Sequence, residues 1–351
     1  MPSATRTIGF ALLSALLGLT AVELLARAGE TIWPLQPPRP LPEPGAASCL
    51  PECMPGIAQM PEQPQGLPRG IPMVPHGRRA WALPPNTEMV ETNVAVRVNS
   101  LALRGPELGP KQANEIRILT LGDSSVFGFG VPESDVFSSV AAAQLSDAWD
   151  RPVTPVIGAT PGYTSVQALH TLQDVGRQVR PDIVVIATLW SDLFQSEAPL
   201  ERAGGQTHPL ATYRMATRLL APWLPAPTVG WIDGESGQTG SARVGLEQYS
   251  RTLDELVRES QALGAQPVVL VLPAPVDLDL EPAPTRIQIY RSTLVALADR
   301  HGLTVVDGPD LFRKKRANNA DFFDQVHPSL SGHAKLGQGL ADVLKAEVRT
   351  Q

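Results

Sequence analysis

The sequence predicts an α/β protein with a doubly wound, mainly parallel five-stranded sheet between two layers of helices. Short β-forming runs alternate with helical patterns from about Val94 onward. The segment 182–189 is an almost continuous apolar run, as expected for a central parallel strand that is buried on both faces. Because each expected strand is followed by an expected helix, the strands can join in parallel through crossover connections. The pattern therefore favours a flavodoxin-like three-layer α/β/α arrangement.

The expected elements follow one another in a regular order. Thr164 precedes one helical pattern and is a residue type that caps helix N-termini. The segment 245–263 is a long amphipathic pattern that leads into another apolar run. The expected strands cover residues 115–121, 152–157, 182–189, 267–272 and 303–307. The expected helices cover residues 135–149, 164–179, 245–263, 286–302 and 332–348.

Composition narrows the class of protein. The chain has 351 residues, of which 43% are hydrophobic and 18% charged, which suits one large or two modest globular domains. The net charge of -6 and the lack of a basic run argue against nucleic-acid binding. Cys49 and Cys53 would form a short disulfide loop or stay two free thiols. No Cys/His pair accompanies them in the sequence, so we expect no zinc site, no other metal and no cofactor.

The N-terminus carries an apolar segment. Residues 1–28 are expected to be a signal anchor or a signal peptide, because Arg6 precedes sixteen uncharged residues, 7–22. The tripeptide 26–28 (Ala-Arg-Ala) is similar to a cleavage site, so anchoring and cleavage both stay open. The expected location is the cell envelope. An uncleaved segment would anchor the domain in the inner membrane, facing the periplasm or the outside, and cleavage would make the protein secreted.

A proline-rich segment follows. Fifteen of the 35 prolines lie between Pro34 and Pro85. Such density disfavours helix and sheet, so residues 29–93 are expected to be an extended linker or stalk. The α/β domain is then expected at 94–351. Within it, the irregular segment 194–241, with Trp223 and Trp231, is expected to form a wall or a lid of the ligand crevice.

The strand expected at 115–121 runs directly into Gly122, Asp123 and Ser124. In parallel α/β sheets the ligand crevice lies beyond the carboxyl ends of the strands, which places Ser124 there. Gly122 would permit a sharp turn, Asp123 would stabilise it, and Ser124 would be presented for chemistry. The other residues that follow expected strand ends are Gly162, Ser191 and Asp307.

A serine hydroxyl becomes a useful nucleophile when a base takes its proton and an acid orients that base. Asp324 and His327 are three residues apart in an irregular segment before the last helix, and Pro328 disfavours helix there. Such a spacing can bring the carboxylate to one ring nitrogen and leave the other free. The remaining histidines fit the linker, helices or irregular segments: His76, His170, His208, His301 and His333.

Other interpretations of residues 122–130 fail on spacing. A phosphate-binding P-loop needs Gly-Lys-Ser/Thr, and no lysine is present. A dinucleotide-binding fingerprint needs a third glycine, where residues 131–133 offer none. The nucleophile elbow of α/β-hydrolases is G-x-S-x-G, and Val126 replaces its last glycine.

Three blocks resemble those of the SGNH (GDSL-like) hydrolase superfamily over about residues 98–344. They are "GDSS" at 122–125, "GATPGYTS" at 158–165 and "DQVHPS" at 324–329. The resemblance implies that Ser124 is the nucleophile and an oxyanion donor, that Gly162 donates a backbone N–H, and that Asp324 orients His327 as the base. The stretch "VNSLALRGPEL" and the apolar N-terminus are similar to bacterial envelope members of this group.

A fourth block departs from the family pattern. Members usually carry G-x-N-D after the central strand, and this sequence has "LWSD" at 189–192. Leu189 replaces the glycine, and Ser191 replaces the asparagine whose side chain donates to the oxyanion. A serine hydroxyl can donate but is shorter and rotates freely. Ser191 is therefore expected as a weaker third oxyanion donor, and Asp192 as a structural residue that bonds loop backbone.

The resemblance implies a serine esterase that works through an acyl-enzyme. The expected substrates are ester-linked acyl groups, most simply O-acetyl groups, on envelope glycans or lipids. Two alternatives stay open. An O-acyltransferase would use the same three residues with a sugar hydroxyl as acceptor, and a non-catalytic glycan-binding module would be consistent with the substitution at Ser191. No oligomeric state is predicted.

Overall fold

The computed structural model describes residues 14, 18–29, 71, 73–91, 93–193, 195–196, 210–212, 215, 229–230, 241–278 and 285–347. Its centre is a five-stranded sheet in the order β12-β11-β7-β5-β6, in which every neighbouring pair is parallel. The strands are β5 (Ile116–Gly122), β6 (Val153–Ile157), β7 (Ile183–Ala187), β11 (Gln266–Val271) and β12 (Thr304–Asp307). Because the chain leaves β5 for β6 on one side and returns to β7 on the other, the sheet is doubly wound, as the sequence predicts.

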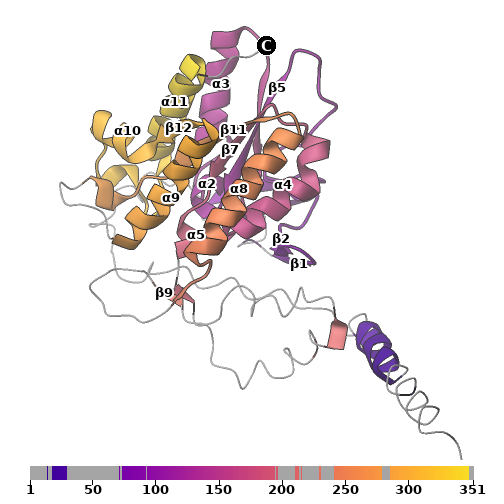
Figure 1. Ribbon diagram of the computed structural model, residues 1–351. Helices are drawn as coiled ribbons and strands as arrows, with labels where there is room; N and C mark the ends of the chain where they lie inside the picture. Colours follow the sequence, from indigo (N-terminus) through magenta and orange to yellow (C-terminus); the bar gives the residue numbers. More distant parts are fainter. Residues whose placement is uncertain are drawn as a thin grey trace, which may run out of the picture.

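Helices cover both faces of this sheet (Figure 1). On one face α3 (Phe137–Trp149) packs against α11 (Leu330–Glu347). On the other face α4 (Ser165–Val179), α8 (Leu246–Ala262) and α9 (Thr285–His301) lie in sequence, each in contact with the next or with the sheet. The three-layer α/β/α fold is therefore confirmed.

Burial explains why these segments form strands and helices. All residues of β5 and β7 are buried, which matches the apolar run expected for a central strand. Helix α4 begins where the sequence predicts it, because Thr164 and Gln167 form a reciprocal capping box.

Some boundaries differ from the prediction. The helix expected from residue 135 begins at Phe137, because a single 3-10 turn, η2 (Glu133–Asp135), precedes it. Helix α11 begins at Leu330 rather than after Ser331. A helix that the sequence did not predict, α10 (Gly308–Lys314), follows β12 directly. The carboxylate of Asp307 accepts a hydrogen bond from Asp310 N at 2.9 Å, so this residue is a helix cap rather than a crevice residue.

Two hairpins precede the sheet. They pair β1 (Val74–His76) with β2 (Ala80–Ala82), and β3 (Thr87–Glu91) with β4 (Val94–Val98), both antiparallel. The expectation that residues 29–93 lack regular structure is therefore wrong for β1, β2 and β3. The three prolines within residues 74–91 do not prevent these strands from forming. Pro75 lies in a two-stranded sheet, in which both strands are edge strands, and Pro84 and Pro85 lie between β2 and β3. Leu83, Met89 and Val96 join the hydrophobic core of the α/β domain.

Several predictions fall on residues that the structure does not describe. They concern most of residues 1–17 in the expected signal segment 1–28, and also Cys49, Cys53, Trp223 and Trp231. Residues 18–29 are helical. Within the part of the chain that the structure describes, no helix combines the length and the apolar character needed to cross a membrane.

Gly122 provides a test of the packing at the end of β5. Its backbone is not in the left-handed region; instead, a Cβ there would lie 2.5 Å from Ala187 O and would also clash with Val126. We expect Gly122→Ala to lower the free energy of unfolding by about 1–3 kcal/mol, because neither neighbour can move without shifting backbone or core. Urea denaturation measures this. Gly109→Ala is the control, since its Cβ would meet nothing within 4 Å, and an equal loss in both variants would contradict the explanation.

Candidate active site

The turn after β5 presents Ser124 at the start of a short helix. Helix α2 (Ser124–Phe127) begins immediately after Asp123, whose carboxylate accepts a hydrogen bond from Ser125 N at 3.0 Å. The same carboxylate accepts one from Ser191 N at 3.0 Å, which ties this turn to the end of β7. Asp123 is buried, and burial raises its pKa although the two N–H groups oppose the shift. The role of Asp123 is thus to stabilise the turn.

The structure brings Ser124, His327 and Asp324 together. His327 Nε2 lies 2.7 Å from Ser124 Oγ, and His327 Nδ1 lies 2.6 Å from Asp324 Oδ2. Ser124 and His327 are 203 positions apart in the chain. The three side chains form one hydrogen-bonded chain from carboxylate to hydroxyl, which is the arrangement that activates a serine nucleophile.

The loop that carries His327 is held in place by its own backbone. Asp324 Oδ1 accepts hydrogen bonds from Val326 N at 2.8 Å and from His327 N at 2.9 Å. Ser125 Oγ donates to Val326 O at 3.0 Å, so the loop is also fastened to α2. These bonds fix the distance between the imidazole and Ser124 before any substrate arrives.

The burial and ionisation of His327 and Asp324 fit a histidine base that is oriented by a carboxylate. His327 is 4% exposed, whereas about a third of the Asp324 side chain, 33%, reaches solvent. Removal from water would raise the pKa of Asp324, but the charge of His327 and the N–H donors around the carboxylate outweigh it and lower the pKa. Asp324 is therefore a carboxylate at neutral pH.

Gly162 lies in the loop that follows β6. The loop is bound to β5 by hydrogen bonds from Gly158 N to Thr120 O at 2.8 Å and from Thr160 N to Gly122 O at 3.4 Å. Gly162 has a φ of +78°, in the left-handed region that favours glycine. In the part of the chain that the structure describes, neither the Gly162 N–H nor the Ser124 N–H donates to another group. Both are therefore available to an oxyanion.

Ser191 is buried beside the turn that carries Ser124. Its backbone N–H is occupied by Asp123, and its side-chain hydroxyl lies close enough to that carboxylate to lower its pKa but meets no partner in good hydrogen-bond geometry among the described residues. A buried hydroxyl without an acceptor costs free energy unless something else binds it. The side chain is thus the one part of Ser191 that could donate to a substrate.

Asp192 and Arg243 form hydrogen bonds to the Gly162 loop and to the helix that follows it. The carboxylate of Asp192 accepts hydrogen bonds from Ser165 N at 2.9 and 3.0 Å and from Ser165 Oγ at 2.6 Å, so it stabilises the start of α4. This confirms that Asp192 bonds loop backbone. Arg243 Nη1 donates to Gly162 O at 2.9 Å and is 4% exposed. No local signal in the sequence marks Arg243, because its acceptor is 81 residues away.

Trp81 borders the same loop. Its Nε1 donates to Pro161 O at 3.4 Å, and Tyr163 Oη donates to Trp81 O at 2.6 Å. A Cβ on Gly162 would lie 3.4 Å from the Trp81 ring. A residue expected in the linker therefore contributes to the wall beside the candidate oxyanion donors.

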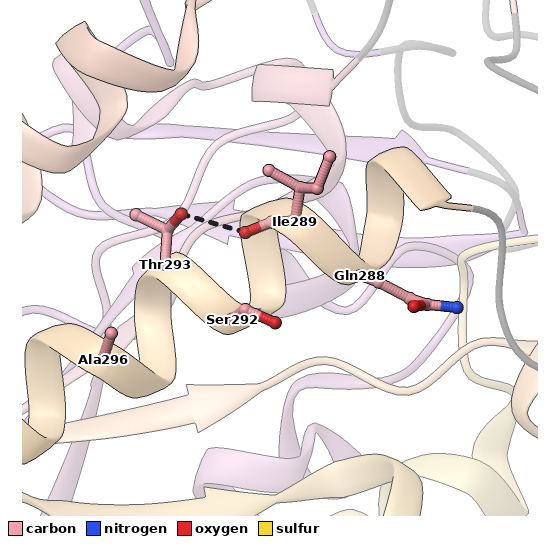
Figure 2. A pocket seen from close by; sticks show the side chains of 5 residues that line it. All are labelled: Gln288, Ile289, Ser292, Thr293 and Ala296. Carbon is pink, nitrogen blue, oxygen red and sulfur yellow. Dashed lines mark hydrogen bonds between the residues drawn. The ribbon is translucent and has the colours of Figure 1, made fainter.

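A hollow lies on the surface of α9, a helix that carries none of the candidate catalytic residues. Figure 2 shows it along one side of α9, where Thr293 Oγ1 donates to Ile289 O at 2.9 Å. It carries no acidic, basic or imidazole group. The lining residues are Gln288, Ile289, Ser292, Thr293 and Ala296. Among the residues with described side chains, no group of three or more His, Cys, Asp or Glu residues could hold a metal ion.

Comparison with known proteins identifies the family. The model of the GDSL-like Lipase/Acylhydrolase family matches residues 120–335, more than half of the chain. The chain belongs to this family. It is a GDSL esterase-type hydrolase, and the matched range contains Ser124, Gly162, Ser191, Asp324 and His327.

Solved structures of low identity resemble this GDSL hydrolase. A lipase/acylhydrolase from Enterococcus faecalis is 18% identical, covers 67% of this chain and 98% of its own, and has a TM-score of 0.43. An acetyl-xylooligosaccharide esterase from Geobacillus Stearmophilus is 18% identical, with 67% and 97% covered and a TM-score of 0.44. The esterase EstA from Pseudoalteromonas sp. is 16% identical, with 66% and 97% covered and a TM-score of 0.40. No curated protein matches the chain.

Asp192 predicts a pH-dependent stability. Burial raises its pKa from 3.8 to about 7, although Ser165 and Arg243 oppose the shift. The folded protein thus keeps a proton that the unfolded chain releases, so this residue's contribution to stability falls as the pH rises from about 4 to about 7. We expect Asp192→Asn to remove that fall. Unfolding free energies of both proteins measured across this range test it, and a wild-type minus variant difference that stays constant with pH would contradict it.

Proposed function

We propose that this GDSL hydrolase is a serine esterase that removes ester-linked acyl groups, most simply O-acetyl groups, from glycans or lipids of the cell envelope. The observation that carries the proposal is the hydrogen-bonded chain from Asp324 through His327 to Ser124, with distances of 2.6 and 2.7 Å. The 2.7 Å distance is short enough for the Ser124 hydroxyl to pass its proton to His327, and the 2.6 Å distance lets Asp324 orient the imidazole. The envelope as the location rests on the apolar N-terminal segment and stays a prediction.

In the first half of the reaction, His327 Nε2 takes the proton of Ser124 as Oγ attacks the ester carbonyl. Negative charge then develops on the carbonyl oxygen, and the N–H groups of Ser124 and Gly162 stabilise it. Asp324 holds the Nδ1 proton and stabilises the imidazolium. The alcohol leaves with the proton from Nε2, and the acyl group stays on Ser124.

In the second half, His327 takes a proton from water, which attacks the acyl-enzyme and releases the acid. An O-acyltransferase would run the same steps with a sugar hydroxyl in place of water. A purely glycan-binding role finds little support, because binding alone would not need a histidine within 2.7 Å of Ser124 Oγ. The two catalytic alternatives therefore differ in the molecule that accepts the acyl group, which is water for the esterase and a sugar hydroxyl for the transferase.

Ser124→Ala tests the nucleophile. With the full chain and p-nitrophenyl acetate, we expect the wild type to give a burst of p-nitrophenol equal to one equivalent of enzyme. The variant should give no burst and lose at least about 10³-fold in rate, because no acyl-enzyme can form. Mass spectrometry of quenched protein would locate the acetyl group on Ser124. A folded wild type that releases no p-nitrophenol above the level of Ser124→Ala would contradict the esterase, and acyl transfer to an added glycan in preference to water would favour the transferase.

Ser191→Ala tests the third oxyanion donor. The hydroxyl of Ser191 lies near the Asp123 carboxylate but meets no partner in good hydrogen-bond geometry among the described residues, so its loss should lower the melting temperature by only about 2–4 °C. If the hydroxyl donates to the oxyanion, kcat should fall by about 10²-fold while KM stays nearly the same. An unchanged kcat would show that the two backbone N–H groups act without it.

A further inference from the structure

A buried arginine lies behind the loop that follows the nucleophile. Arg104 comes from the "VNSLALRGPEL" stretch and is 2% exposed. Its Nη1 donates to Phe127 O at 2.7 Å and to Gly128 O at 2.8 Å, and its Nη2 donates to Val131 O at 2.6 Å. Its Cζ also lies 4.7 Å from the centre of the Phe127 ring. One guanidinium thus holds three carbonyls of the loop 127–131.

The charge of Arg104 is retained inside the protein. Burial lowers its pKa to about 10, while the nearby Glu91 and Glu133 oppose the shift, so it remains a cation at neutral pH. Placing a cation among backbone carbonyls is costly unless its donors are bonded in good geometry. A planar fork that serves several carbonyls at once is a property of arginine that lysine does not share.

The loop turns tightly around this guanidinium. Gly128 and Gly130 have φ values of +85° and +69°. Gly130 N donates to Glu91 Oε2 at 3.2 Å, so the hairpin that supplies Glu91 holds the loop from a second side. The residue between these two glycines is Phe129, whose backbone position is therefore fixed from the N-terminal part of the chain.

The ring of Phe129 lies on the imidazole of His327. The two ring centres are 4.7 Å apart and the planes differ by 27°. The hydrogen bonds to Asp324 and Ser124 hold the two ring nitrogens, and Phe129 contacts the face of the ring. A flat side chain against that face opposes tilting of the imidazole plane.

We propose that Arg104 and Phe129 are positioning residues for His327, with Arg104 fixing the loop and Phe129 holding the imidazole plane in line with Ser124 Oγ. This inference rests on the proposed role of His327 as the base. The contact also has a chemical consequence, because the face of an aromatic ring stabilises a cation, and His327 becomes an imidazolium when it takes the proton of Ser124.

Phe129→Leu and Arg104→Lys test the proposal in the full chain. Leucine keeps an apolar side chain but removes the flat ring, and we expect kcat for p-nitrophenyl acetate to fall by about tenfold with little change in KM. Phe129→Tyr keeps the ring and should retain kcat within about twofold. Arg104→Lys cannot reach three carbonyls and should lower kcat by about 10- to 100-fold.

Arg117→Lys is the matched control. Arg117 is also 2% exposed and also donates to backbone carbonyls, those of Val179 at 3.1 Å and Gly109 at 2.7 Å, but it lies at the amino end of β5. Both lysine variants should lower the melting temperature, and only Arg104→Lys should lower kcat. Equal losses of kcat in the two variants would overturn the role of Arg104, and a wild-type kcat in Phe129→Leu would overturn that of Phe129.

A spectroscopic measurement separates this proposal from the proposed function. The Nδ1 proton of His327, in its 2.6 Å hydrogen bond to Asp324, should give a low-field proton NMR signal that His327→Gln lacks. We expect the signal to broaden or shift in Phe129→Leu and in Arg104→Lys, and to stay unchanged in Arg117→Lys. If the wild type hydrolyses no ester above the Ser124→Ala level, the esterase fails while this signal still tests positioning. A signal unaffected by Phe129→Leu would overturn the positioning proposal even in an active enzyme.

Discussion

The buried carboxylate of Asp123 is the interaction on which the site depends. It joins the carboxyl ends of β5 and β7, because it accepts hydrogen bonds from both Ser125 N and Ser191 N. Asp192 makes a similar link from the end of β7 to the start of α4, because its carboxylate accepts hydrogen bonds from Ser165 N and Ser165 Oγ. Three neighbouring strand ends, β5, β7 and β6, are thereby linked by carboxylates and N–H groups in addition to apolar packing. Ser124 and Gly162 lie on the segments that these bonds connect.

The same kind of bond fixes His327, the proposed base. Asp324 binds two backbone N–H groups of its own loop as well as the imidazole, so the residue that orients His327 also folds the segment that carries it. The N-terminal part of the domain holds the loop after α2: Glu91 at the end of β3 accepts a hydrogen bond from Gly130 N, and Arg104, which follows β4, donates to Val131 O. A hydrolase site that involves four loops is thus held by ionisable side chains that bond to backbone groups.

The sequence predicted the parts of this arrangement that depend on local patterns. The apolar run that became β7, the cap at Thr164, and the placement of Ser124 after β5 all follow from periodicity and strand-end rules. The hairpins and α10 were missed. Proline density disfavours ordinary strands but not two-stranded edge sheets, and Pro309 at the start of α10 was not recognised as a helix-starting residue. Arg104 and Arg243 could not be assigned, because their acceptors are carbonyls far along the chain, which any sequence supplies.

Because position 191 carries a serine, the charged groups buried next to the proposed oxyanion donors become important. Two carboxylates, Asp123 and Asp192, and one guanidinium, Arg243, lie near the donors that would face an oxyanion, and fully ionised they would carry a net negative charge. Negative potential there would work against the developing oxyanion. Burial raises the pKa of both carboxyl groups, that of Asp192 to about 7, and so shifts both toward their neutral forms. Burying these acids therefore acts in the same direction as the Arg243 cation, and the proposed oxyanion site, with Ser191 as its third donor, would benefit from both.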